Sequence, residues 1–195
     1  MALTADEVVR FYRRASVREG ELEAFVERLR AEPEAAAVLD EIAKKPGAIR
    51  GWAAHVASLA LPAGSAVPIL LRVARSRDVD VRDGAIQDLL RVDPVAARRL
   101  APLFHRMLGD SGDWHANMVS RLSGMWGLLA IGARDAEDRM RALRDDVSQP
   151  ENVREAADAV LLALEDPDAA LRRADDEASV FVQRAAEILR RRTDA

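Results

Sequence analysis

Apolar residues recur along the chain with the spacing of one helix face, and short polar turns separate the segments. A clear example is the stretch from Glu21 to Arg30, whose apolar positions are Leu22, Phe25, Val26 and Leu29. The spacing Thr4-x-x-Glu7 predicts a capping box at the start of an earlier helix. Turn and proline signals predict further helices at about 33–42, 48–61, from 66 to a break at 77–80, from 81, 94–108, 114–131, 135–147, 151–164, and on either side of Asp166-Pro167.

A ten-residue signature repeats within this pattern. It reads Val81-Arg82-x-x-Ala85-x-x-x-Leu89-Leu90 and again Val153-Arg154-x-x-Ala157-x-x-x-Leu161-Leu162. Looser copies are Ile49-Arg50-x-x-Ala53 and Ser120-Arg121-x-x-Gly124-x-x-x-Leu128-Leu129. A period of about 30 to 40 residues is typical of stacked helical hairpins, because one pair cannot bury its own apolar face and must pack on the next pair.

Composition supports a helical chain. Hydrophobic residues make up 49% of the 195 positions but aromatic residues only 4%, so the core must be built from Ala, Leu and Val. Ala and Leu are strong helix formers, whereas sheets draw on β-branched and aromatic residues. The formal net charge of -4 gives no basic excess, so nucleic acid is not an expected partner.

The signature and its flanking turns resemble the HEAT-repeat family, in particular the short bacterial HEAT-like repeats also found in phycobilisome lyases. The resemblance rests on Ala66-Val67-Pro68 at the start of one helix and on Asp78 and Asp80 before Val81-Arg82. It implies an all-α fold, a right-handed α-α superhelix of about five helical pairs. We therefore expect a single domain over 1–195, with divergent N-terminal capping helices in 1–47, core repeats in 48–165 and C-terminal capping helices in 166–195. The third copy departs from the pattern, with Ser120 for Val and Gly124 for Ala.

One arginine follows the first position of each signature copy. Arg50, Arg82, Arg121 and Arg154 could form an anion-binding ladder, or each could bond an acid in the preceding turn, such as Asp78, Asp80 or Glu151. The near-balanced charge favours the second interpretation, because bidentate carboxylate pairing is the usual partner of the guanidinium fork.

The resemblance also predicts a binding surface, since the second helices of HEAT-like pairs line the concave face. The candidate binding residues on that face are Trp52, His55, Asp83, Gln87, Trp126 and Glu155. Tryptophan is common at interface hot spots, which makes Trp52 and Trp126 candidate anchors; alternatively, each fills a gap in the core. The apolar helix around Trp126 favours the core, whereas Arg50 and His55 beside Trp52 favour the surface.

A polar cluster raises the question of a metal. His105, Asp110, Asp113 and His115 are donor types that bind divalent ions, but their spacing matches no ligand motif. The turn that contains them can equally end one helix and cap the next. We expect no metal and no cofactor, and the absence of cysteine excludes thiolate sites and disulfides.

The function that this pattern favours is a non-catalytic interaction scaffold or adaptor that binds a protein or peptide on its concave surface. An enzyme is less favoured, because no Gly-x-Ser-x-Gly motif, cysteine or glycine-rich phosphate loop occurs. Two alternatives remain: a HEAT-like DNA glycosylase for alkylated bases, for which Trp52, Trp114, Trp126 and Asp113 are similar residue types, and a bilin lyase-like protein. Neither a signal peptide nor a membrane span is visible, so a cytoplasmic location is expected.

Overall fold

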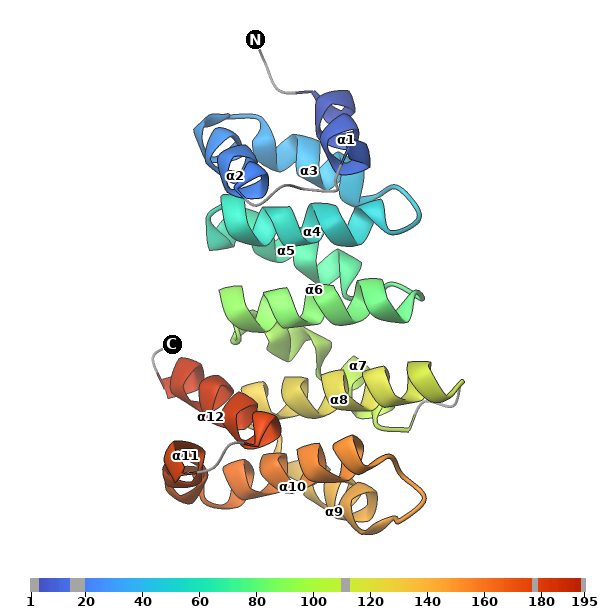
Figure 1. Ribbon diagram of the computed structural model, residues 1–195, viewed down its shortest axis with the longest axis vertical. Helices are drawn as coiled ribbons and strands as arrows, with labels where there is room; N and C mark the ends of the chain where they lie inside the picture. Colours follow the sequence, from blue (N-terminus) through green and yellow to red (C-terminus); the bar gives the residue numbers. More distant parts are fainter. Residues whose placement is uncertain (1–3, 15–19, 110–112, 177–178, 194–195) are drawn as a thin grey trace. The chain divides into compact units, whose positions relative to one another are not determined.

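The computed structural model describes residues 4–14, 20–109, 113–176 and 179–193, and every regular element in these ranges is a helix (Figure 1). The predicted all-α class is therefore confirmed. The chain forms two compact units, residues 1–93 and 94–195. Their boundary falls inside the segment 48–165 that was expected to hold the core repeats.

The described part of the first unit contains six helices, five of which form two layers. In chain order they are α1 (Ala5–Arg14), α2 (Glu21–Ala31), α3 (Ala35–Ala43), α4 (Ile49–Ala60), α5 (Ala63–Val73) and α6 (Val79–Val92). Besides its sequence neighbours, α4 contacts α2 and α6, while α3 contacts α5. This alternation places α2, α4 and α6 in one layer and α3 and α5 in the other, with a core of Ala, Leu, Ile and Val side chains between them.

Capping residues determine where two of these helices begin. The predicted capping box is confirmed: the Glu7 amide donates to Thr4 Oγ1 (3.3 Å), and the Thr4 amide donates to Glu7 Oε2 (3.2 Å). At the start of α6, the Asp78 carboxylate accepts hydrogen bonds from the amides of Asp80 and Val81. The start predicted at residue 66 is wrong, because α5 already begins at Ala63, after Pro62.

The second unit contains six α-helices and two short 3₁₀ helices in its described part. These are η1 (Ala96–Leu100), α7 (Ala101–Met107), α8 (Trp114–Ile131), η2 (Arg134–Ala136), α9 (Glu137–Asp145), α10 (Glu151–Glu165), α11 (Pro167–Asp176) and α12 (Val180–Thr193). The continuous helix predicted over 94–108 is wrong. Pro102 has no N–H to bond the Arg98 carbonyl, so the segment divides into η1 and α7.

Two close contacts organise this second unit. Glycines at positions 124 and 127 let α7 approach α8, and a Cβ at Gly124 would lie only 2.9 Å from the Phe104 carbonyl oxygen. This contact explains why Gly124 replaces the alanine of the signature. On another side of α8, α12 packs against both α8 and α10 (Figure 1). Trp126 stacks there on Phe181.

The signature has the structural role that its spacing predicts. Its first, fifth and ninth positions are buried in the copies that begin at Val81, Ser120 and Val153, and Ala53 is buried in the copy that begins at Ile49. The copies lie near the starts of α4, α6 and α10 but in the middle of α8. Within the described residues, no helix is both long and apolar enough to cross a membrane.

Candidate functional site

A buried carboxylate on α6 joins two side chains that reach the surface, one on α4 and one on α6 of the first unit. Asp88 on α6 is only 7% exposed, and charged side chains are rarely buried to this extent unless they are paired. His55 Nδ1 on α4 lies 3.1 Å from Asp88 Oδ2, and Arg91 Nη2 lies 2.9 Å from Asp88 Oδ1. The side chains of His55 and Arg91 are 47% and 37% exposed, so both reach the surface.

Ser58 completes this group, which we call the His55 cluster (His55, Ser58, Asp88 and Arg91). The Ser58 hydroxyl accepts a hydrogen bond from Arg91 Nη2 (2.6 Å) and donates one to the His55 carbonyl oxygen (2.6 Å). The hydrogen bond to Asp88 raises the pKa of His55, while partial burial and the Arg91 charge act in the opposite direction. Protonated His55 is therefore favoured over a wider pH range than in a free chain.

The geometry of the His55 cluster suits binding better than nucleophilic catalysis. In a nucleophilic triad the serine hydroxyl bonds the imidazole, which accepts its proton. Here the hydroxyl instead bonds a backbone carbonyl and Arg91. What the cluster presents to solvent is a pair of hydrogen-bond donors in fixed positions, which can bind a carboxylate or another anionic acceptor.

The other candidates from the first unit lie on the same two helices. Gln87 Nε2 donates to Asp83 Oδ1 (3.4 Å) one turn away on α6, and both residues are half-buried. Trp52 is also half-buried and contacts three aromatic rings. Its ring centroid lies 6.2 Å from that of Phe11, 5.3 Å from that of Tyr12 and 5.9 Å from that of Phe25. Trp52 therefore packs from α4 against α1 and α2, and it lies one turn before His55.

The candidates from the second unit have different surroundings. Trp126 is 5% exposed and stacks on Phe181 of α12, with ring centroids 6.5 Å apart. It therefore occupies the core position that its apolar helix suggested. Glu155 is exposed on α10 and lines a polar cavity of about 310 Å³, together with Arg144, Glu151, Arg154, Asp158, Arg173, Ser179 and Val182.

The predicted pairing of the signature arginines with preceding acids is wrong for three of them. Arg121 donates to the amide oxygen of Gln149 (2.6 Å) rather than to a carboxylate. Arg50 and Arg154 make no ion pair within the described ranges, and their buried Nε atoms have no hydrogen-bond partner there. Asp78, a predicted partner, instead caps α6.

The suggested metal ligands do not form a cluster in the part of the chain that the structure describes. His105 Nε2 lies 3.4 Å from Asp135 Oδ2, and Asp113 caps α8 by accepting from the Ala116 amide (2.9 Å). His115 is exposed, and Asp110 lies outside the described residues. No group of three His, Asp or Glu side chains that could hold an ion occurs among the described residues.

Sequence reasoning missed Ser58, Asp88 and Arg91. A signal for Asp88 was present, because it lies seven residues after Val81 and three after Ala85, on a helix face whose other positions are apolar. A charged residue on such a face must have a partner or distort the packing. Comparison with models of protein families, with curated proteins and with solved structures found no match to this chain.

Proposed function

We propose that this chain is a HEAT-like helical-repeat protein of the right-handed α-α superhelix class and that it serves as a non-catalytic interaction module. Its partner is a protein or peptide, which binds the exposed side of α4 and α6 in the first unit. The recurring signature supports the repeat class, as do the contacts between alternate helices, α4 with α6 and α3 with α5. Such contacts build the continuous surface that repeat proteins use for binding.

The observation that carries this proposal is the buried Asp88. A carboxylate with 7% exposure loses most of its hydration, and here it holds His55 and Arg91 at once. Replacing such a buried charged group by apolar residues is often neutral or stabilising, so stability alone is a weak reason for its presence. A role in recognition accounts for it better, because donors that are already fixed lose little side-chain entropy on binding.

The chemistry of the His55 cluster indicates what the partner presents. Both surface groups are hydrogen-bond donors, and they carry two positive charges against the one negative charge of Asp88 when His55 is protonated. Such a site favours a carboxylate side chain on an acidic segment of the partner. Trp52, one turn away on α4, offers apolar surface beside it.

The proposal can be tested by site-specific photo-crosslinking in native cells. Gly84 on α6 is exposed, and a side chain added there would meet nothing within 4 Å. Gly64 on α5 has the same surroundings but belongs to the other helix layer, so it is a matched control. We expect a photoreactive residue at position 84 to give one discrete protein adduct that position 64 does not give.

The crosslinked protein is then purified and titrated against variants of the chain. Arg91→Gln and His55→Gln should each weaken binding about tenfold, as is typical for a charged pair at an interface. Arg77→Gln is the control, since Arg77 is exposed and forms no ion pair among the described residues, and it should bind like the parent. Identical adducts from both positions, or equal affinities for all three variants, would refute the proposed surface.

A further inference from the structure

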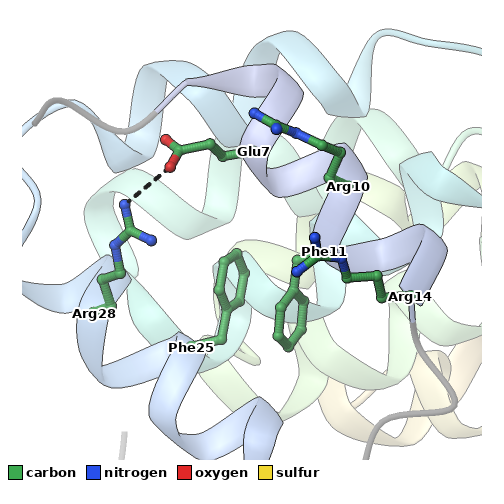
Figure 2. A pocket seen from close by; sticks show the side chains of 6 residues that line it. All are labelled: Glu7, Arg10, Phe11, Arg14, Phe25 and Arg28. Atoms are coloured by element: carbon green, nitrogen blue, oxygen red, sulfur yellow. Dashed lines mark hydrogen bonds and ion pairs between the residues drawn. The ribbon is translucent and has the colours of Figure 1, made fainter.

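A cavity lies between α1 and α2, apart from the His55 cluster. It has a volume of about 210 Å³ and is lined by Glu7, Arg10, Phe11 and Arg14 from α1 and by Phe25 and Arg28 from α2. Figure 2 shows Glu7 and Arg28 paired on one side of the cavity and Arg14 beside Phe11 on the other. Three arginines and one glutamate therefore surround two aromatic rings.

The aromatic wall of this cavity is held in place from behind. Phe11 and Phe25 stack in parallel, with ring centroids 4.0 Å apart and an angle of 5° between the ring planes. The Trp52 ring, which belongs to α4, contacts both of these rings. Because Phe25 is buried and Phe11 is half-buried, the pair presents a fixed apolar surface to the cavity.

Glu7, the single acid that lines the cavity, already has two partners. Glu7 Oε2 accepts from the Thr4 amide (3.2 Å), and Glu7 Oε1 lies 3.4 Å from Arg28 Nη2. The Thr4 amide is the main cause of a lowered pKa for Glu7, and the Arg28 guanidinium adds to it. Glu7 is therefore ionised at neutral pH, and its charge offsets that of Arg28.

Two cations remain for a ligand. Arg10 uses its Nε to donate to the Asp6 carbonyl oxygen (3.3 Å) and forms no ion pair in the described ranges, although its charge contributes to the lowered pKa of Glu7. Arg14 makes no hydrogen bond or ion pair with any described residue. A guanidinium that is not otherwise occupied can bind a carboxylate through two parallel hydrogen bonds.

We propose that this cavity binds a carboxylate attached to a small apolar group. The carboxylate pairs with Arg14 and Arg10, and the apolar group packs on the wall made by Phe11 and Phe25. The cavity is smaller than the roughly 300–1,000 Å³ of ordinary cofactor and drug sites, so it accommodates one side chain or a compact acid rather than a nucleotide. This site does not depend on the partner-binding role proposed for the His55 cluster.

The probe is hydrocinnamate, a phenyl ring joined to a carboxylate by two methylenes, titrated into the full-length protein by NMR. Of the three tryptophans, all of which lie in the described ranges, Trp52 is the one with a ring contact to the aromatic wall. Its indole signal should therefore move on binding, while those of Trp114 and Trp126 stay in place. For a ligand of this size we expect a Kd of about 1 mM.

Matched ligands and variants separate the charge contribution from the apolar one. The neutral analogue hydrocinnamamide should bind at least about tenfold more weakly, because it cannot form the charged pair. Arg14→Gln should cause a similar loss, whereas Arg13→Gln on the same helix should bind like the parent, since Arg13 does not line this cavity. Arg14 has no partner among the described residues, so Arg14→Gln leaves the fold intact, which circular dichroism can check.

A further experiment distinguishes two kinds of ligand with this chemistry, the C-terminus of a protein and a free small acid. A short peptide that ends in phenylalanine with a free carboxylate is compared with the same peptide ending in an amide. Tighter binding of the free-acid peptide than of hydrocinnamate assigns the site to a protein C-terminus, and binding of hydrocinnamate alone assigns it to a free acid. Equal binding of acid and amide, equal losses in Arg13→Gln and Arg14→Gln, or an unmoved Trp52 signal would each overturn the proposal.

Discussion

The ring of Phe104 in α7 lies where any residue other than glycine at position 127 of α8 would place its Cβ. A Cβ built on Gly127 lies 2.6 Å from three ring carbons of Phe104, closer than real Cβ atoms approach other atoms. Phe104 is fully buried, so moving its ring away would disturb the side chains packed around it. The approach of α7 to α8 therefore depends on the missing side chain at this position.

Gly127→Ala should consequently destabilise the second unit by about 1–3 kcal/mol, the usual cost of overpacking a well-packed core. Gly51→Ala in α4 is the matched control, because its Cβ would meet Val81 at 3.4 Å, an ordinary contact distance. There the better helix propensity of alanine should stabilise the chain by up to about 1 kcal/mol. Urea unfolding of both variants measures the difference, and a loss of stability in both would contradict the interpretation.

Truncation of the two tryptophans of α8 should change the free energy of unfolding by very different amounts. Trp126 is 5% exposed and Trp114 is 66% exposed. Trp126→Ala leaves a cavity beside Phe181 and should cost about 3–5 kcal/mol. Trp114→Ala should change the free energy of unfolding by no more than about 0.5 kcal/mol. Thermal unfolding of the two variants decides the matter, and similar melting temperatures would show that Trp126 is not part of the core.

The contact between His55 and Asp88 predicts a pH dependence of stability. The pKa of His55 is raised above the ordinary histidine value of 6.5, mainly by the hydrogen bond to Asp88. The folded state therefore binds the proton more tightly than the unfolded state does. The resulting stabilisation is fully present below pH 6.5 and is lost as the pH rises through the higher pKa of the folded state.

His55→Gln measures this contribution, because it keeps a side chain that can form hydrogen bonds but removes the titration. The stability of the parent relative to His55→Gln should be greater at about pH 5.5 than at about pH 8. NMR titration of the His55 ring protons gives the pKa directly. A difference in stability that does not change across this range, or a His55 pKa at or below the ordinary value of 6.5, would contradict the prediction.

Binding to duplex DNA separates the interaction module from the glycosylase alternative. The net charge of -4 provides no basic surface for phosphate contacts. The Asp113 carboxylate, the acid suggested for the glycosylase, caps α8 instead. At moderate salt we expect no measurable affinity for duplex DNA, with or without an alkylated base. Affinity that falls steeply as salt is raised would support the glycosylase, because that slope reports phosphate contacts.

Helix class and most helix positions could be predicted because they depend on local spacing. Thr4 and Glu7 lie within one turn of each other, and their capping box formed as the sequence predicted. Pro102 was also visible, but its effect depends on the bond to the Arg98 carbonyl that it prevents, which a pattern of apolar residues does not report. Likewise, Gly124 departed from the signature for a reason that lies in another helix, at the Phe104 carbonyl.

The His55 cluster was only half predictable for a similar reason. Arg50 and Arg82 hold the same position in their signature copies. When the two copies are aligned on these arginines, His55 corresponds to Gln87, the residue before Asp88. The repeat therefore predicts that the helical turn around His55 lies beside the turn around Asp88. Which polar groups then meet depends on side-chain rotamers and on the exact helix register, and a repeat pattern specifies neither.

The packing of α12 on α8 has a consequence for how the second unit folds. In a simple repeat array each hairpin contacts only its neighbours, so the array can fray from its end. Here Phe181 reaches back to Trp126, and Arg192 donates to the Leu129 carbonyl across 63 positions. Closing so long a loop slows folding, and it ties the last helix to the middle of the unit. Deleting α12 should therefore expose Trp126 and melt the whole unit cooperatively, rather than shorten it by one hairpin.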